Sequence, residues 1–229
     1  MPLSSISFRR PLTSYAKVQA ITARLMRNRR FQLSRARVRN SRYLDLGCGP
    51  NTHPAFINLD FQWHPGIDLC WDVTRGLPFA DGTLAGVFSE HCLEHFDLPA
   101  ATALLREVRR VLGPRGIFRI IVPDGGLYLR IYHQQSAGNT VERFPYEAEE
   151  RRQPIWTPML SVNRIFFQDR ESLFGHRMIY DYALLRQLLL QVGFERAELR
   201  SFQEGADSHL LIDSASRRCE SLYVEASSG

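Results

Sequence analysis

A glycine turn with acids spaced behind it is the part of this sequence best suited to chemistry. Gly47-Cys48-Gly49 follows a short apolar run, and glycines let backbone N–H groups approach a ligand where a Cβ would block it. Asp60, Asp72 and the run Ser89-Glu90-His91 each end a later expected strand. The carboxyl ends of parallel strands meet at one edge of a sheet, where ligands bind. The pattern therefore predicts a ligand site in which Asp60 accepts hydrogen bonds from two ribose hydroxyls.

A second motif suggests different chemistry. Residues 91–95, HCLEH, match the inverted zinc-peptidase pattern H-x-x-E-H, in which a helix would place both imidazoles on one face. Here the motif comes directly after an expected strand, and Pro99 limits any helix beyond it. No downstream acidic ligand motif is recognisable. We therefore predict no metal site, and a zinc hydrolase that uses His91, Glu94 and His95 is the alternative.

The elements that would position these residues alternate between strand and helix. Such alternation predicts an α/β fold with a mostly parallel sheet. Residues 50–55 are too few for a full helix, so the first crossover should be shortened. Strands are expected at 43–46, 55–60, 67–72, 84–89, 117–122, 194–202 and 220–226, and amphipathic helices at 98–112 and 179–192.

Composition excludes several classes of protein. The 229 residues are 44% hydrophobic and 23% charged, as in an ordinary globular protein and unlike a disordered or collagen-like chain. No apolar run approaches the length of about 18 residues that a transmembrane helix needs. Four cysteines without a CxxC pair favour a reducing compartment, and we expect a cytoplasmic protein.

Positive charge is concentrated at the N-terminus. Eleven of the 29 Lys and Arg residues lie within residues 1–42, which contain no Asp or Glu. Val18, Ile21, Leu25 and Met26 fall at helical spacing, which favours an amphipathic helix docked on the body. We therefore expect a basic helical arm over residues 1–41. Contact of this arm with an anionic membrane or with nucleic acid, and a transit peptide, are the alternatives.

Four ordered motifs resemble the class I S-adenosylmethionine-dependent methyltransferases, in a type 11-like subgroup with a shortened first crossover. They are residues 44–50 (LDLGCGP), 77–83 (LPFADGT), 89–95 (SEHCLEH) and 105–116 (LREVRRVLGPRG). Residues 179–194 and 220–226 are similar to one compact subgroup of these enzymes. The resemblance implies a methyltransferase domain over 42–229 with a Rossmann-like, mostly parallel seven-stranded sheet and helices on both faces.

The resemblance also implies roles for individual residues. S-adenosylmethionine would be the cofactor, and Asn51 stands where the family has a third glycine. The cofactor-binding positions would be Asp45, Gly47, Cys48, Gly49, Asn51, Asp60, Phe61, Asp72, Val73, Ser89 and Glu90. Of these, Asp45 would reach the cofactor's amino group, Phe61 would lie on the adenine, and Asp72 with Val73 would meet the adenine edge.

The acceptor side is the least specified by the sequence. Glu90 and His91 are the candidates for a general base, and Glu90 could equally hold the cofactor's amino group. Residues 125–177 are expected to form a lid insertion, whose many aromatics could instead be a small core of its own. His176, Arg177, Tyr180 and Tyr128 are predicted to contact a small-molecule or glycan acceptor. O- or N-methylation is favoured and C-methylation stays open; a non-catalytic cofactor-binding relative is a further alternative.

Overall fold

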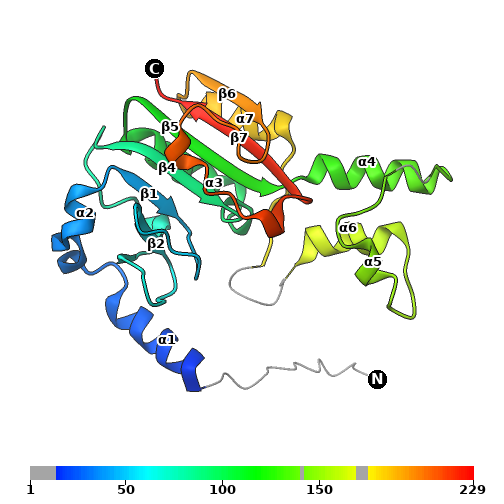
Figure 1. Ribbon diagram of the computed structural model, residues 1–229, viewed down its shortest axis with the longest axis horizontal. Coiled ribbons are helices and arrows are strands. Elements are labelled where there is room, and N and C mark those ends of the chain that lie inside the picture. Colours follow the sequence, from blue (N-terminus) through cyan, green and yellow to red (C-terminus); the bar gives the residue numbers. More distant parts are fainter. Residues whose placement is uncertain (1–13, 140–141, 169–174) are drawn as a thin grey trace.

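A single mostly parallel sheet forms the centre of the molecule (Figure 1). The structure is a computed structural model that describes residues 14–139, 142–168 and 175–229. Within these residues seven strands lie in the order β3-β2-β1-β4-β5-β7-β6, and only β7 is antiparallel to its neighbours. The strands are β1 (Tyr43–Leu46), β2 (Ile57–Asp60), β3 (Leu69–Cys70), β4 (Leu84–Glu90), β5 (Leu112–Pro123), β6 (Arg196–Arg200) and β7 (Ser221–Ser227). The predicted α/β fold class is confirmed.

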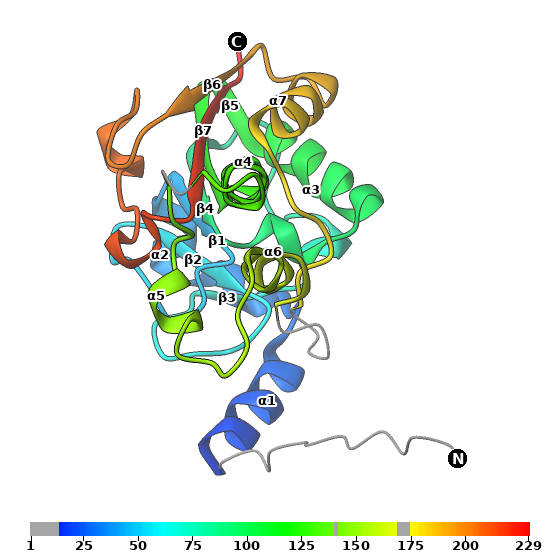
Figure 2. The same ribbon diagram turned by 90° about the vertical axis from the view of Figure 1, so that its right-hand side faces the viewer.

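Two capped helices cover one face of this sheet. Helix α3 (Leu98–Val111) begins at Asp97, whose side chain accepts a hydrogen bond from the Ala100 N–H, and Asp181 caps α7 (Tyr182–Gln191) in the same way. Both helices turn an apolar stripe toward the sheet, and Figure 2 shows α3 and α7 on the same side of it. Because strand residues alternate between faces, the residues that meet these helices are every second one, such as Phe118, Ile120 and Val122 of β5.

The opposite face around β5 and β7 is covered by the connection between β6 and β7, where the sequence predicted helices. Leu210 packs there against Phe88, Ile121 and Tyr223. Arg119, fully buried in β5, holds this connection in place: its Nε lies 2.7 Å from Oδ1 of Asp213, and its guanidinium also pairs with Glu225 and donates to backbone carbonyls. A buried cation is tolerable only with such a full set of acceptors.

The first three connections of the sheet are short. Between β1 and β4 the described chain contains a 3-10 turn, Val73–Arg75, and no α-helix. The shortened first crossover is therefore observed, and the chain passes from β1 to β2 with only the residues between Leu46 and Ile57. As a result, the end of β2 lies directly against the turn that follows β1.

A helical lobe follows β5 at the carboxyl end of the strands (Figure 1). Tyr128, Ile131, Phe144, Val162 and Ile165 form its own small core, and Tyr132 and Trp156 pack against it, so these four aromatics have a structural role. The lobe consists of α4 (Gly125–Ser136), α5 (Glu147–Glu150) and α6 (Pro158–Phe167). That it acts as a lid stays a prediction, and residues 140–141 and 169–174 lie outside the described part.

The N-terminal arm contains the predicted helix, α1 (Ser14–Met26), but not in the predicted orientation. Val18, Ile21 and Leu25 are 56%, 61% and 64% exposed, so the apolar stripe points away from the body. Ala23 is buried instead, because the small side chain lets the helix approach Cys70 closely. None of the described helices combines the length and apolar composition that a membrane crossing requires.

The arm attaches through the residues after α1. The Asn28 N–H donates to the Cys70 carbonyl (3.1 Å), and the buried Gln32 side chain accepts from the Cys70 N–H (2.9 Å). These two bonds satisfy the outer edge of β3, which would otherwise be an unpaired strand edge. The arm continues through the 3-10 turn Arg30–Ser34 and the short helix α2 (Ala36–Asn40) into β1.

Candidate active site

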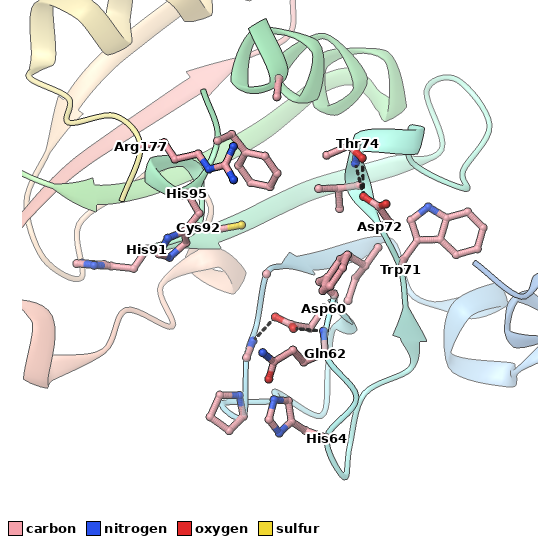
Figure 3. Close-up of a pocket in the computed structure, with 18 of the residues that line it drawn as sticks. Asp60, Gln62, His64, Trp71, Asp72, Thr74, His91, Cys92, His95 and Arg177 are labelled. Atoms are coloured by element: carbon pink, nitrogen blue, oxygen red, sulfur yellow. Dashed lines mark hydrogen bonds between the residues drawn. The ribbon is translucent and has the colours of Figure 1, made fainter. Parts of the chain in front are cut away.

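A cavity of about 630 Å³ lies at the carboxyl ends of β1, β2 and β4. Figure 3 shows its labelled residues in three groups: His91, Cys92, His95 and Arg177; Trp71, Asp72 and Thr74; and Asp60, Gln62 and His64. The volume falls in the range typical of small-molecule and cofactor sites. The predicted residues that line it are Gly47, Gly49, Asp60, Phe61, Asp72, Val73, His91 and Arg177.

The glycine turn contributes space to this cavity, not unpaired donors. Gly47 and Gly49 have φ of +75° and +55°, the left-handed region that disfavours side chains. A Cβ on Gly47 would collide with the Cys92 side chain, whereas a Cβ on Gly49 would meet nothing within 4 Å. The N–H groups of Gly47 and Cys48 donate to the Leu59 carbonyl, which the short crossover brings against the turn. The prediction of bare N–H donors is thus corrected, and the close approach of a ligand to Gly49 stays a prediction.

Asp60 joins β2 to the glycine turn. Its Oδ2 accepts from the Gly49 N–H (2.9 Å) and its Oδ1 from the Gln62 N–H (2.7 Å), and it lines the cavity. Burial raises the pKa of this carboxyl, and the two backbone N–H groups oppose the shift. Asp60 thus stands where the sequence predicted a ribose acceptor; each oxygen has a second lone pair for a hydroxyl.

Phe61 also lines the cavity, with one side of its ring already engaged. The Arg27 guanidinium lies 3.5 Å from the ring centroid, and Arg27 Nε donates to the Phe61 carbonyl. This cation–π contact holds the ring in place from the arm. A contact between Phe61 and an adenine stays a prediction.

Asp45 lies beneath the turn in β1 and is 3% exposed. Burial raises its pKa to about 8, and the negative charges of Glu90 and Asp60 add to the shift. Asp45 does not itself line the cavity. A carboxyl with a raised pKa close to a binding cavity would be restored to its charged form by a cationic group such as an ammonium.

A third wall comes from the chain after β3. Asp72 caps the turn Val73–Arg75 by accepting from the Thr74 N–H and hydroxyl, and its own N–H donates to the Asn28 side chain. Trp71 is fixed by a bond from its indole N–H to the Gly76 carbonyl (2.8 Å). Both residues line the cavity together with Val73. A contact of Asp72 and Val73 with an adenine edge stays a prediction.

Glu90 points away from the cavity. It shares the sheet face of Phe88, and its carboxylate accepts hydrogen bonds from the backbone N–H (2.9 Å) and the hydroxyl of Ser214. Ser89 is buried and donates to the Leu46 carbonyl. The strand's alternation puts consecutive residues on opposite faces. The structure therefore does not bring Ser89 or Glu90 to the cavity lining, and a base role for Glu90 has no geometric support.

His91 lines the cavity, but both of its ring nitrogens are engaged. Arg217 Nη1 donates to Nδ1 (3.1 Å), and Nε2 lies 2.8 Å from the Ser221 hydroxyl, which itself donates to the Arg217 carbonyl. Nε2 therefore carries the proton. Burial and the nearby Arg217 lower the pKa of His91 to about 3, so the ring is neutral. His91 is thus a fixed wall of the cavity.

The helix that a zinc hydrolase would need is absent from residues 91–95. His91 has φ of +50° and ends β4, while Glu94 and His95 belong to the 3-10 turn Leu93–His95. The two imidazoles therefore do not share a helical face. The helical pairing of His91 with His95, on which the zinc-hydrolase alternative depended, is therefore not observed.

The four predicted acceptor residues are divided by the structure. Arg177 lines the cavity, and its N–H donates to the Glu94 carbonyl. His176 lies beside His95, with ring centroids 5.4 Å apart. Tyr180 is buried in the main core and Tyr128 in the lobe, so neither reaches the cavity.

Several lining residues were not predicted. Two predicted residues do not line the cavity: Cys48 packs against the arm, and Asn51 is exposed. The residues that line the cavity without having been predicted are Pro50, Leu59, Gln62, His64, Trp71, Thr74, Cys92, His95, Phe96, Asp97 and Ala100. Gln62 and His64 follow Asp60 closely, and their position after an expected strand was the signal that could have identified them.

Comparisons with known proteins found one family model and a set of similar solved structures. Residues 51–120 match the family model of the methyltransferase domain. No curated protein matches the chain. Similar solved structures include S-adenosylmethionine-dependent methyltransferases from Thermotoga maritima (12% identity, 83% of each chain covered, TM-score 0.47), Mesorhizobium loti (18%, 81% of this chain and 90% of that one, 0.45) and Archaeoglobus fulgidus (17%, 82% and 86%, 0.46).

The matched residues carry β2, β3, β4, α3 and most of β5, and with them most of the cavity wall. The segment that resembles a methyltransferase domain therefore forms the middle of the sheet and most of the cavity.

Proposed function

We propose that the chain is a class I S-adenosylmethionine-dependent methyltransferase, and that it methylates an oxygen or nitrogen of a small molecule or glycan end that carries a negative charge. The observation that carries this proposal is the position of Arg177. Among the described residues that line the cavity, Arg177 alone has a permanent positive charge, and it lies with His91 and His95 away from Asp60 (Figure 3). A guanidinium binds carboxylates and phosphates in a bidentate manner.

The cofactor end of the cavity would be formed by the glycine turn, Asp60 and the wall around Asp72. The open space beside Gly49 fits a ligand that approaches the backbone closely, and Asp60 offers a carboxylate for ribose hydroxyls. S-adenosylmethionine supplies an activated methyl group on a sulfonium. The protein's contribution is then chiefly alignment of the acceptor, since a direct displacement needs nucleophile, carbon and leaving group in line.

A screen of labelled-methyl transfer against fractionated cell extract tests this function. We expect transfer by the intact protein and none by Asp60→Ala. Arg177→Ala should raise the acceptor KM about 10–100-fold, since a charge-assisted hydrogen bond contributes about 1.5–3 kcal/mol, and leave cofactor binding unchanged. Arg186→Ala, on the exposed side of α7, is the matched control. Acceptor KM values that are equal in Arg177→Ala and the control would contradict the anionic acceptor.

We also infer that α1 binds anionic membranes. Its exposed Val18, Ile21 and Leu25 lie on the side opposite the docked Ala23, and Lys17 and Arg24 are on the same helix. Apolar side chains between basic ones suit a lipid interface better than a nucleic acid backbone.

Sedimentation with vesicles tests the arm. Binding to phosphatidylserine-containing vesicles should exceed binding to phosphatidylcholine vesicles and weaken with salt. Ile21→Ser with Leu25→Ser should reduce it several-fold, while Leu199→Ser, another exposed leucine, should not. Binding to duplex DNA that the Ile21 and Leu25 changes leave intact, with no vesicle binding, would point to nucleic acid instead.

A further inference from the structure

Three potential metal ligands from two distant segments meet beside the cavity. Glu94 and His95 belong to the 3-10 turn after β4, and His176 belongs to the chain that leads into α7. One ligand atom from each of the three lies within 4.8 Å of the other two. His95 also lines the cavity, so the cluster borders the end at which Arg177 lies.

Glu94 is the member that most requires an explanation. The residue is fully buried, and neither carboxylate oxygen has a hydrogen-bond partner among the described residues. A buried carboxylate without a partner is strongly unfavourable, and such groups in native proteins are normally paired or bound to a metal. Burial accordingly raises the pKa of Glu94 to about 8.

Within the part of the chain that the structure describes, no neighbouring side chain neutralises Glu94 by direct contact. His91 Nδ1 lies 3.5 Å from Glu94 Oε1, but that nitrogen already accepts a hydrogen bond from Arg217 and carries no proton to donate. The carboxylate therefore requires a proton or a cation as its partner.

His176 has the tautomer that a metal ligand would need. Its Nδ1 lies 2.6 Å from the Ile165 carbonyl, and because a carbonyl can only accept, Nδ1 carries the proton. The lone pair is then on Nε2. Metal-binding histidines are typically fixed in this way, with the second ring nitrogen donating to a backbone carbonyl or a carboxylate.

We propose that Glu94, His95 and His176 bind a divalent transition-metal ion, with Zn²⁺ as the best match. Two imidazoles and one carboxylate form a donor set that suits zinc and leaves a fourth position open, whereas Mg²⁺ and Ca²⁺ prefer oxygen ligands throughout. Ligand atoms in a tetrahedral site lie about 3.4 Å apart when metal–ligand bonds are about 2.1 Å. Small side-chain rotations would bring the three atoms to that spacing.

The ion would fasten the segment before α7 to the end of β4. The backbone already joins these segments, because the N–H groups of Arg177 and Met178 both donate to the Glu94 carbonyl. A metal on His176 adds a side-chain link directly next to Arg177. The ion therefore fixes the acceptor end of the cavity; this consequence, unlike the binding itself, rests on the function proposed above.

Titration of the chelator-stripped full chain with Zn²⁺ at neutral pH tests the site. We expect about one ion per chain and a higher Tm with Zn²⁺ but not with Mg²⁺. Glu94→Gln and His176→Asn should each weaken binding by more than the roughly 10–100-fold that changes outside the ligand set cost. His133→Asn, an exposed histidine in α4, and Cys219→Ser, the exposed cysteine, are matched controls that should bind as the wild type does.

Two further measurements keep the test decisive. X-ray absorption of the zinc-loaded wild type should show nitrogen and oxygen ligands and no sulfur. This measurement does not depend on the folding of any variant. The Tm increase caused by S-adenosylhomocysteine should persist in Glu94→Gln, so a failure of the metal site is distinguishable from a failure of the proposed function. Absence of zinc binding, a sulfur ligand, or unchanged binding in both ligand variants would each overturn the proposal; the first would leave a proton as the partner of Glu94.

Discussion

Gly47→Ala should abolish cofactor binding and destabilise the fold. The added methyl would collide with both side-chain atoms of Cys92, and its Cβ would come within 2.8 Å of the Cys92 Cβ. The backbone at φ +75° adds roughly 1–2 kcal/mol of strain for any residue with a Cβ. Relief of the clash must move either the turn after β1 or the chain after β4, and both line the cavity. Calorimetric titration with S-adenosylhomocysteine and thermal unfolding measure the two effects.

Alanine substitutions at two other glycines distinguish the cost of backbone strain from the effect of a methyl group that obstructs the cavity. Gly138 has φ of +83° and, like Gly49, would meet nothing within 4 Å if it had a Cβ. Gly138→Ala should therefore cost only the strain and leave cofactor binding intact. Gly49→Ala should cost similar stability but weaken binding, because its methyl would project beside the cavity. Equal cofactor affinity in Gly49→Ala and Gly138→Ala would show that the turn does not contact the cofactor.

Asp45→Asn is expected to stabilise the cofactor-free protein while it weakens cofactor binding. The folded pKa of Asp45, about 8, is far above the value of about 3.9 in an unfolded chain. Asp45 therefore makes its largest contribution to stability below pH 4, and that contribution falls as pH rises from about 4 to 8. A tenfold difference in proton affinity between the folded and unfolded chain corresponds to about 1.4 kcal/mol, so at pH 7 the penalty is roughly 4 kcal/mol. Asparagine keeps the shape and removes this penalty.

Denaturant unfolding between pH 4 and 9 checks the stability effect, and the Asn variant should show a flatter pH profile there. For binding, calorimetry at pH 7 in buffers of different ionisation enthalpy should show a proton released by the wild type and not by Asp45→Asn, provided that an ammonium restores the charge of Asp45. Unchanged affinity together with raised stability would mean that Asp45 does not meet the amino group. Stability that falls in Asp45→Asn would contradict the raised pKa itself.

The sequence predicted the regular elements well because period and caps are local. The strand at 43–46 and the start of the helix at 98 match the structure, since Asp97 and Pro99 define that start chemically. The prediction that the apolar stripe of the arm packs against the body was wrong for a physical reason. Periodicity locates an amphipathic face but not its partner, and the small Ala23 docked where larger side chains could not.

Within the site, the sequence predicted correctly which residues near strand ends line the cavity. It failed where a shift of one residue along a strand moves a side chain to the other face of the sheet. Asp60, Asp72 and His91 line the cavity, whereas Glu90, one residue before His91, points to the opposite face. The glycine turn was predicted correctly, but not that its N–H groups are used internally by Leu59 and Asp60. His176 lies near Glu94 because of the path that the chain takes between the helical lobe and α7. That path depends on tertiary packing, so no local sequence pattern predicts it.

The residues that follow α1 contact both the edge strand β3 and the cavity wall. Asn28 and Gln32 complete the border of β3, while Arg27 supports Phe61 and Asn28 supports Asp72 in the cavity wall. By reciprocity, if a ligand of the arm shifts this stretch and so changes cofactor affinity, the cofactor changes the affinity for that ligand by an equal factor. We expect a protein that lacks residues 1–36 to lose the contacts of Arg27 with Phe61 and of Asn28 with Asp72, and with them the support of this part of the cavity wall.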